Sequence, residues 1–155
     1  MDRYYWKLYF DSATIKQAED LRQEICILST GVQIHMDVYE QPDHNAPVLI
    51  FNHGGGGYCR FFVPLALALH QRGYTVIVPD QRGQGYSEGD RTDFTIGELV
   101  QNIVDVAYWA RVRYTGKLFL GGASVGGGLT YSAAAAGAPV DAIICHNLYN
   151  FGDPH

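Results

Sequence analysis

The sequence lacks the marks of several large classes of protein. No apolar run approaches the roughly 18 residues that a membrane-spanning helix requires. Basic residues are fewer than acidic ones, 11 against 16, and the formal net charge is −5. This balance argues against nucleic acid or an anionic membrane as the main partner. The N-terminal segment has charges on both sides of a short aromatic run and no small-residue cleavage site, so we expect no signal peptide.

Cysteine is scarce as well. Cys26, Cys59 and Cys145 are odd in number and widely spaced, with no C-x-x-C pair. This spacing matches neither a disulfide framework nor a zinc-finger type of site. We therefore expect reduced thiols in a cytoplasmic protein, with no bound metal.

The chain has 155 residues, of which 47% are hydrophobic and 17% charged. This length suffices for one domain with a buried core and is short for two. We expect a single domain over residues 1–155, in which residues 1–24 form an N-terminal extension with a helix. Residues 4–10 are rich in aromatics and can form either a short strand or a flap.

An antiparallel hairpin is predicted near the N-terminus. Ser12 can cap a helix over residues 13–24, and apolar segments over 25–28 and 32–39 flank a Ser-Thr-Gly turn. In the second segment apolar residues alternate with polar ones such as His35. That alternation predicts a strand with one face in water.

Beyond the hairpin, short apolar segments alternate with helical patterns. The predicted strands cover residues 48–52, 75–78, 118–120 and 140–145, and the predicted helices cover 61–71, 96–113 and the segment after Ser124. Such alternation is typical of βαβ units. The sequence therefore predicts an α/β fold: a mostly parallel sheet with helices on both faces and an antiparallel hairpin at its start.

Residues 117–136, KLFLGGASVGGGLTYSAAAA, contain the most informative motif of the chain. An apolar strand runs into G-x-S-x-G, and an alanine-rich helix follows, which is the pattern of a nucleophile elbow around Ser124. The turn is so tight that positions two before and two after the serine face neighbouring backbone. Gly122 and Gly126 satisfy that steric requirement.

A second glycine-rich segment follows the predicted strand 48–52. His53 precedes four glycines, among them Gly54, Gly55 and Gly56, at the end of a strand where open α/β sheets place their ligand crevice. Without side chains, the backbone N–H groups can approach a developing oxyanion. A flexible turn and a phosphate-binding loop are the alternatives.

The sequence matches neither of two common nucleotide-binding motifs. A P-loop requires Gly-Lys followed by Ser or Thr, and Lys117 is followed by leucine. A dinucleotide motif G-x-G-x-x-G begins at Gly83 but has Glu88 in the place of its third glycine. These failures favour the oxyanion interpretation.

Residues 80–87, DQRGQGYS, carry glycines at alternate positions. Such a segment can form a tight, closely packed turn, and Asp80 and Arg82 can fix it by charge-assisted hydrogen bonds. We interpret this segment as structural, shaping the rim of the crevice.

In this order, Asn52-His53-Gly54, D-x-R-G-x-G-x-S over residues 80–87 and G-x-S-x-G around Ser124 resemble the α/β-hydrolase family. Within it the chain looks most like the lysophospholipase, esterase and serine-aminopeptidase branch. The resemblance covers roughly residues 25–148. It implies a hydrolase core, a small-molecule ester or acyl substrate, and neither metal nor organic cofactor.

The resemblance also implies roles for individual residues. Ser124 would be the nucleophile, and the N–H groups of Val125 and Gly55 would form the oxyanion hole. His53, with Gly54 and Gly56, would support that loop rather than act as the base. Gly122 and Gly126 would be the small residues of the elbow.

The chain departs from the family pattern after Ser124. In such hydrolases the acid and then the histidine follow the serine, on later strands, and few residues follow Ser124 here. We therefore expect the N-terminal portion of a hydrolase, with the acid and base of the triad absent from this chain. His146, after the last strand, is the best internal candidate for a base and is otherwise a polar residue of the rim. Asp153 with His155 forms a second, terminal pair.

The last predicted strand raises a further expectation. Residues 140–146 are patterned for the middle of a sheet, yet here they would form an edge. A bare apolar edge invites pairing with another chain. We expect self-association, or pairing with a missing C-terminal half, through this strand.

Two functions follow. In the first, the chain is the core of a serine hydrolase acting on a carboxylic ester or related acyl bond. In the second, it is a non-catalytic pseudo-hydrolase or interaction module that keeps the fold. The intact elbow favours the first, and the absent base favours the second.

Overall fold

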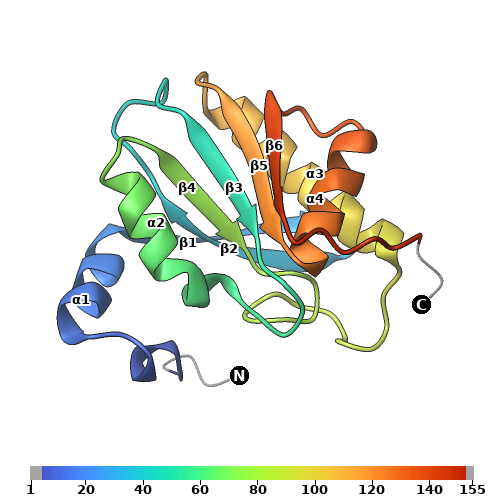
Figure 1. The fold of residues 1–155 in the computed structure, drawn as a ribbon, viewed down its shortest axis with the longest axis horizontal. Helices are drawn as coiled ribbons and strands as arrows, with labels where there is room; N and C mark the ends of the chain where they lie inside the picture. Colours follow the sequence, from blue (N-terminus) through green and yellow to red (C-terminus); the bar gives the residue numbers. More distant parts are fainter. Residues whose placement is uncertain (1–4, 153–155) are drawn as a thin grey trace.

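The computed structural model describes residues 5–152, and its centre is a six-stranded mixed sheet (Figure 1). The order of the strands in this described part is β1-β2-β4-β3-β5-β6. Their bounds are β1 Arg22–Ser29, β2 Val32–Tyr39, β3 Val48–Asn52, β4 Thr75–Pro79, β5 Leu118–Ala123 and β6 Ala142–His146. The pairs β1·β2 and β2·β4 are antiparallel, and the remaining pairs are parallel. The predicted hairpin and mostly parallel sheet are thus confirmed.

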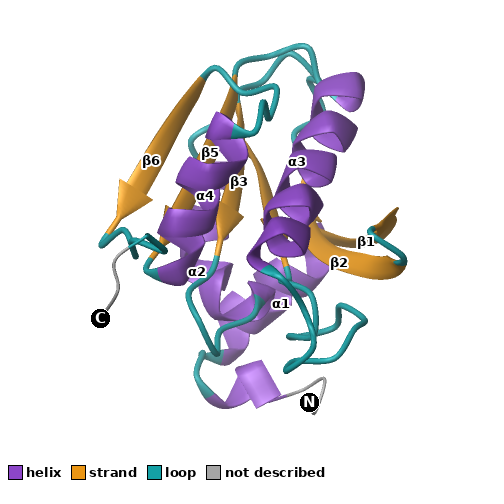
Figure 2. Ribbon diagram, turned by 90° about the vertical axis from the view of Figure 1, so that its right-hand side faces the viewer, coloured by secondary structure: helices purple, strands orange, loops and turns teal. Residues whose placement is uncertain are grey.

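Helices cover both faces of the sheet, with α3 and α4 on one face and α1 and α2 on the other (Figures 1 and 2). Within residues 5–152 the α-helices are α1 Ser12–Leu21, α2 Val63–His70, α3 Ile96–Arg113 and α4 Val125–Ala135, and the 3-10 helices are η1 Tyr5–Leu8 and η2 Cys59–Phe62. Each side has its own buried apolar cluster. This arrangement leaves the carboxyl ends of β3, β4 and β5 free to carry loops.

The boundaries of α2 and α3 follow from local signals that the sequence shows. Pro64 lies in the first turn of α2, and Gly73 follows the helix with a φ of +86°. In α3, Thr95 accepts a hydrogen bond from the Glu98 N–H while the Glu98 carboxylate accepts one from the Thr95 N–H. This reciprocal capping box fixes the start of the helix.

The N-terminal segment differs from the prediction. Asp11, and not Ser12, caps α1, because its carboxylate accepts a hydrogen bond from the Thr14 N–H at 2.8 Å. The helix ends at Leu21, and β1 begins at Arg22 rather than at residue 25. In the aromatic segment, Tyr5–Leu8 form the 3-10 helix η1 and not a strand.

The second hairpin strand is also more buried than its alternation predicts. His35 and Asp37 belong to the face that we expected in water, yet they are 3% and 1% exposed. η2 and the loop after β4 cover that face, and Arg60 and Asp80 contact the two side chains. The prediction that this face lies in water is therefore wrong. A face with buried polar side chains and a face in water give the same alternation of polar and apolar residues in the sequence.

The opposite end of the sheet is open. β6 is an edge strand, and its residues Ile143 and Ile144 are 36% and 61% exposed. On the face that α2 covers, Figure 1 shows α2 in front of the β4 side, while no labelled helix lies in front of β5 and β6. An apolar groove of about 340 Å³ lies there, lined by Leu49, Phe51, Leu65, Leu69, Tyr74, Phe119, Gly121 and Ile144. The predicted bare edge is thus present in the described residues.

Candidate active site

Ser124 stands at the junction between β5 and α4. Its φ of 54° and ψ of −125° lie in a region that residues other than glycine rarely adopt. Such strain persists only where the surroundings hold it. Here the Ser124 N–H donates to the His146 carbonyl at 2.9 Å, and the Ser124 carbonyl accepts from Gly128 and Tyr149. The side chain itself is exposed.

The two glycines of the motif are required by close backbone contacts. A Cβ on Gly122 would lie 2.3 Å from the Gly126 carbonyl oxygen. A Cβ on Gly126 would lie equally close, at 2.3 Å, to the carbonyl oxygens of Asn52 and His53. The end of β3 therefore packs directly against the first turn of α4, and any larger side chain would push the two apart.

The same packing brings the glycine loop beside Ser124. A Cβ on Gly54 would lie 3.9 Å from Ser124 Oγ, and one on Gly55 would lie 3.7 Å from Val125 Cγ2. In the described residues no acceptor is hydrogen-bonded to the Gly55 N–H. Val125 is the first residue of α4. The N–H groups in the first turn of a helix have no hydrogen-bond acceptor within that helix. The expected pair of donors and the serine hydroxyl thus share one edge of the sheet.

His53 is buried at the base of this loop. Its Nδ1 contacts the Gly54 carbonyl at 2.8 Å, and its Nε2 accepts the Gln81 N–H at 3.1 Å. A ring that accepts at Nε2 and donates at Nδ1 is neutral. Burial lowers the pKa of His53, partly offset by the Gly54 hydrogen bond and by Asp80. Both nitrogens are occupied, so His53 holds the loop and has no free nitrogen for Ser124.

The loop after β4 locks onto the glycine loop. The Gln81 amide donates to the His53 carbonyl, and the Gln84 side chain accepts the Gly56 N–H at 3.1 Å. Asp80 and Arg82 fix this segment by charge-assisted hydrogen bonds, as the sequence predicts. Asp80 accepts the backbone N–H groups of Cys59 and Tyr86, and Arg82 donates to the Thr30 carbonyl at 3.0 Å.

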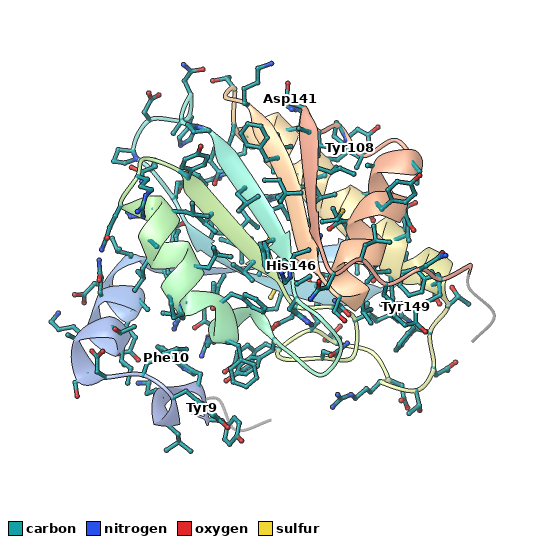
Figure 3. All side chains as sticks on the ribbon, in the orientation of Figure 1. Tyr9, Phe10, Tyr108, Asp141, His146 and Tyr149 are labelled. Carbon is teal, nitrogen blue, oxygen red and sulfur yellow. The ribbon has the colours of Figure 1, made fainter. Side chains whose placement is uncertain are left out.

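His146 ends β6 beside the elbow, at the carboxyl ends of the strands (Figure 3). It is the register partner of Ala123, and its side chain is exposed. Within residues 5–152 no side chain is hydrogen-bonded to the Ser124 hydroxyl, His146 included. The pair Asp153 and His155 lies outside the described residues.

A buried polar cluster next to His53 escaped the sequence analysis. It combines His35, Asp37, Cys59, Arg60 and Asp80. Burial raises the pKa of Asp37, while the neighbouring Arg22 and Arg60 oppose that shift. Burial also raises the pKa of the Cys59 thiol well above its usual range. The sequence indicates this cluster only by placing His35 and Asp37 on the same face of a predicted strand. That pattern is equally typical of a strand face in water.

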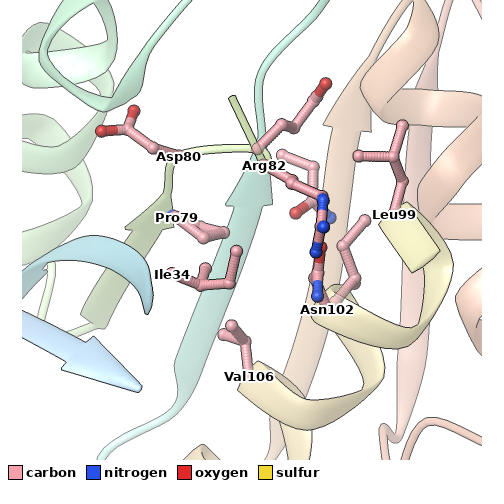
Figure 4. Close-up of a pocket in the computed structure, with 10 residues that line it drawn as sticks. Ile34, Pro79, Asp80, Arg82, Leu99, Asn102 and Val106 are labelled. Atoms are coloured by element: carbon pink, nitrogen blue, oxygen red, sulfur yellow. The ribbon is translucent and has the colours of Figure 1, made fainter. Parts of the chain in front are cut away.

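A small pocket lies between α3 and the strands β2 and β4 (Figure 4). Its volume is about 10 Å³, room for roughly one water molecule. The side-chain atoms Asn52 Oδ1, Arg82 Nε and Asn102 Oδ1 have no hydrogen-bond partner in the described part of the chain, and all three residues line this cavity. It is too small for a substrate, so the exposed edge around Ser124 remains the candidate site.

Fold and site together define an α/β-hydrolase core. A family model for the serine aminopeptidases S33 (Hydrolase_4) matches residues 43–147, more than half of the chain. The chain therefore belongs to this family of α/β-hydrolases.

Solved structures agree on the fold. GrgF, an α/β hydrolase from Penicillium sp. sh18, is 24% identical with a TM-score of 0.72; the match covers 80% of this chain and 45% of that one. Est1E from Butyrivibrio proteoclasticus, in a structure with bound ferulic acid, is 25% identical with a TM-score of 0.69, covering 77% and 50%. Epoxide hydrolase VrEH1 from Vigna radiata is 24% identical with a TM-score of 0.68, covering 81% and 40%.

One curated relative is the "Uncharacterized 31.7 kDa protein in traX-finO intergenic region" of Escherichia coli. It is 30% identical over 132 residues, which cover 81% of this chain and 45% of that protein. The chain thus spans less than half the length of this relative. No helix in the described part of the chain is long and apolar enough to cross a membrane.

Proposed function

We propose that the chain carries the nucleophile and the oxyanion hole of a serine hydrolase for carboxylic esters or related acyl bonds. The observation that carries the proposal is the strained backbone of Ser124, which holds an exposed hydroxyl at the strand–helix junction beside a glycine loop. Backbone strain of this kind concentrates at functional sites. A plain βα turn has no need of it.

In the proposed reaction Ser124 Oγ attacks the acyl carbon while a base takes the hydroxyl proton. The carbonyl oxygen becomes an oxyanion, and the N–H groups of Gly55 and Val125 donate to it. Collapse of the intermediate expels the alcohol, which takes up the proton, and leaves an acyl-serine. Water then hydrolyses the acyl-serine by the same steps and releases the acid.

The base and its acid are proposed to come from sequence outside residues 5–152, because a serine without a base is a poor nucleophile. The match to this chain covers only 40–50% of the length of these solved structures and of the curated relative. His146 is the one internal alternative that we keep, since it lies at the same edge of the sheet.

The substrate proposal is limited to the acyl class. The ferulic acid bound to Est1E is a carboxylic acid, and that enzyme is 25% identical to this chain. This likeness supports a carboxylic acid derivative as substrate. The aromatic side chains of this chain suit an apolar acyl group, although core packing accounts for them equally well.

A fluorophosphonate probe tests the proposal, since it labels only activated serines. We expect the folded wild-type chain to be labelled at Ser124 if a base is present in the chain or its oligomer, and Ser124→Ala to abolish the label. Ser132→Ala, on the same helix α4, is the matched control and should label as the wild type does. Labelling that survives Ser124→Ala would refute the assignment of the nucleophile.

A non-catalytic role is the second candidate, favoured by the unpartnered Ser124 hydroxyl among the described residues. It predicts a folded chain that the probe does not label, alone or with added C-terminal sequence. If His146 is the base, labelling should fall strongly in His146→Ala while the far-ultraviolet circular dichroism stays unchanged.

The bare strand β6 is proposed to pair with another polypeptide, either a second copy or the remainder of a longer hydrolase. Its apolar side chains are exposed on both faces of the edge, and such edges template pairing. Light scattering after size exclusion should show a mass that rises with concentration in the case of a second copy, and Ile144→Lys should prevent that rise. Val112→Lys, at an apolar position 88% exposed on α3, is the control. A wild-type monomer at all concentrations contradicts self-association.

A further inference from the structure

Three side chains that often bind metals meet in the interior beside the glycine loop. His35 comes from β2, Cys59 from the start of η2 and Asp80 from the end of β4, and none of the three is more than 3% exposed. His35 Nδ1 lies 3.2 Å from Asp80 Oδ2, and Cys59 Sγ lies 3.5 Å from the same oxygen. The third separation, from Sγ to Nδ1, is 3.9 Å. None of these residues has a part in the proposed hydrolysis.

The charge of Asp80 needs a counterpart. Its carboxylate is fully buried, and among the described residues no lysine or arginine lies within ion-pair distance of it. Backbone N–H groups of Cys59 and Tyr86 donate to it at 2.6 and 2.8 Å. His53 is held neutral by its own hydrogen bonds. A buried carboxylate without a cation is costly, so a bound cation beside Asp80 would offset that cost.

The separations fit a tetrahedral zinc ion. Zinc bonds of about 2.0–2.1 Å to nitrogen, 2.0–2.2 Å to oxygen and 2.3 Å to sulfur place the ligand atoms about 3.3–3.6 Å apart. The three measured separations, 3.2, 3.5 and 3.9 Å, lie around that range. A set of thiolate, imidazole and carboxylate also suits zinc better than magnesium or calcium.

Two carboxylates lie near the far side of the imidazole. His35 Nε2 has no hydrogen-bond partner in the described part of the chain, and Asp37 Oδ1 and Glu24 Oε2 each lie 3.6 Å from it. A histidine bound to a metal through one nitrogen commonly directs its other N–H to a carboxylate. The guanidinium of Arg60 contacts Asp37 at 3.3 Å and Glu24 at 2.7 Å.

We propose that His35 Nδ1, Cys59 Sγ and Asp80 Oδ2 bind one zinc ion. Binding replaces the thiol proton of Cys59, which leaves to solvent, by a zinc–sulfur bond. The ion would link β2, the start of η2 and the end of β4 to one another. It has a structural role, and it lies apart from Ser124. The sequence analysis, which expected no metal, missed it because the three ligands are far apart in the chain.

Cobalt substitution tests the site on the full chain. After removal of metal with a chelator, one equivalent of Co²⁺ should produce the thiolate-to-cobalt charge-transfer band in the near ultraviolet. Cys59→Ala should abolish the band, whereas Cys145→Ala, at a half-buried thiol on β6, should keep it. His35→Gln serves as a second ligand variant in case Cys59→Ala does not fold.

Zinc should also raise the melting temperature of the wild type relative to the chelator-treated protein, because a ligand that binds only the folded state stabilises it. The melting temperature of folded Cys59→Ala should not respond. A folded wild type that gives no charge-transfer band with Co²⁺ overturns the proposal. A band that persists in Cys59→Ala also overturns it.

Discussion

Replacing Gly126 by alanine puts the geometry of the elbow to a quantitative test. The new Cβ would lie 2.3 Å from two backbone carbonyl oxygens, those of Asn52 and His53. Ordinary contact begins near 3.4 Å, so β3 and α4 would have to separate by about 1 Å. Overpacking of this kind costs about 1–3 kcal/mol. We expect the upper end of that range, because both clashing atoms belong to backbone that cannot rotate away.

Two other glycines separate the steric effect from the effect of backbone conformation. Gly73 has a φ of +86° and no atom within 4 Å of its Cβ position, so Gly73→Ala should cost about 1–2 kcal/mol through strain alone. Gly97 lies in the first turn of α3 with ordinary φ and only a 3.8 Å contact to Thr95. Gly97→Ala should stabilise the chain by about 0.5 kcal/mol.

Thermal unfolding followed by circular dichroism measures all three variants. In a chain of this size 1 kcal/mol shifts the melting temperature by about 2–4 °C. Gly126→Ala should therefore melt about 6–12 °C below the wild type, Gly73→Ala less far below it, and Gly97→Ala slightly above it. A Gly126→Ala protein as stable as Gly97→Ala would show that β3 and α4 do not pack as the structure has them.

Two further predictions concern single hydrogen-bonded groups. Thr95→Ala removes half of the capping box of α3 and should lower the free energy of unfolding in urea by about 1 kcal/mol; an unchanged midpoint would contradict the cap. The Leu118 N–H, Lys117 and Arg111 hold the pKa of Asp141 well below its ordinary 3.8. Since its stabilisation is present above that ordinary pKa and lost as the pH falls, Asp141→Asn should lower the melting temperature at pH 7, and the difference should shrink below about pH 4. A difference that is constant with pH would contradict the ion pairs.

The elements that the sequence predicts well are those with local steric or capping causes. The elbow follows from Gly122 and Gly126, whose side-chain positions face backbone, and α3 follows from Thr95 and Glu98. The capping box lies within one helical turn, and the whole elbow motif lies within one short segment, although the Gly126 position faces the distant backbone of Asn52 and His53. Local rules therefore sufficed for the backbone of the candidate site.

The remaining features depend on contacts between distant segments. Asp11 and Ser12 are both good caps, and only the geometry of the turn selects Asp11. His35 is buried because η2 and the loop after β4 cover it, and no pattern within β2 contains that information. The partners of Asp80 and Arg82 have the same origin, since Cys59 and Thr30 lie far from these residues in the sequence.

The order of the strands has a consequence for how the chain folds. β4 lies between β2 and β3 although it follows both in sequence, so the N-terminal hairpin has no place in the sheet until β4 has paired with it. Such non-local pairing slows folding, because long loops must close before their contacts are gained. The hairpin can form early by itself, while the parallel strands β3, β4 and β5 assemble around it later. An intermediate with an unattached hairpin is therefore expected on the folding pathway, and refolding should be slower than in helical proteins of this length.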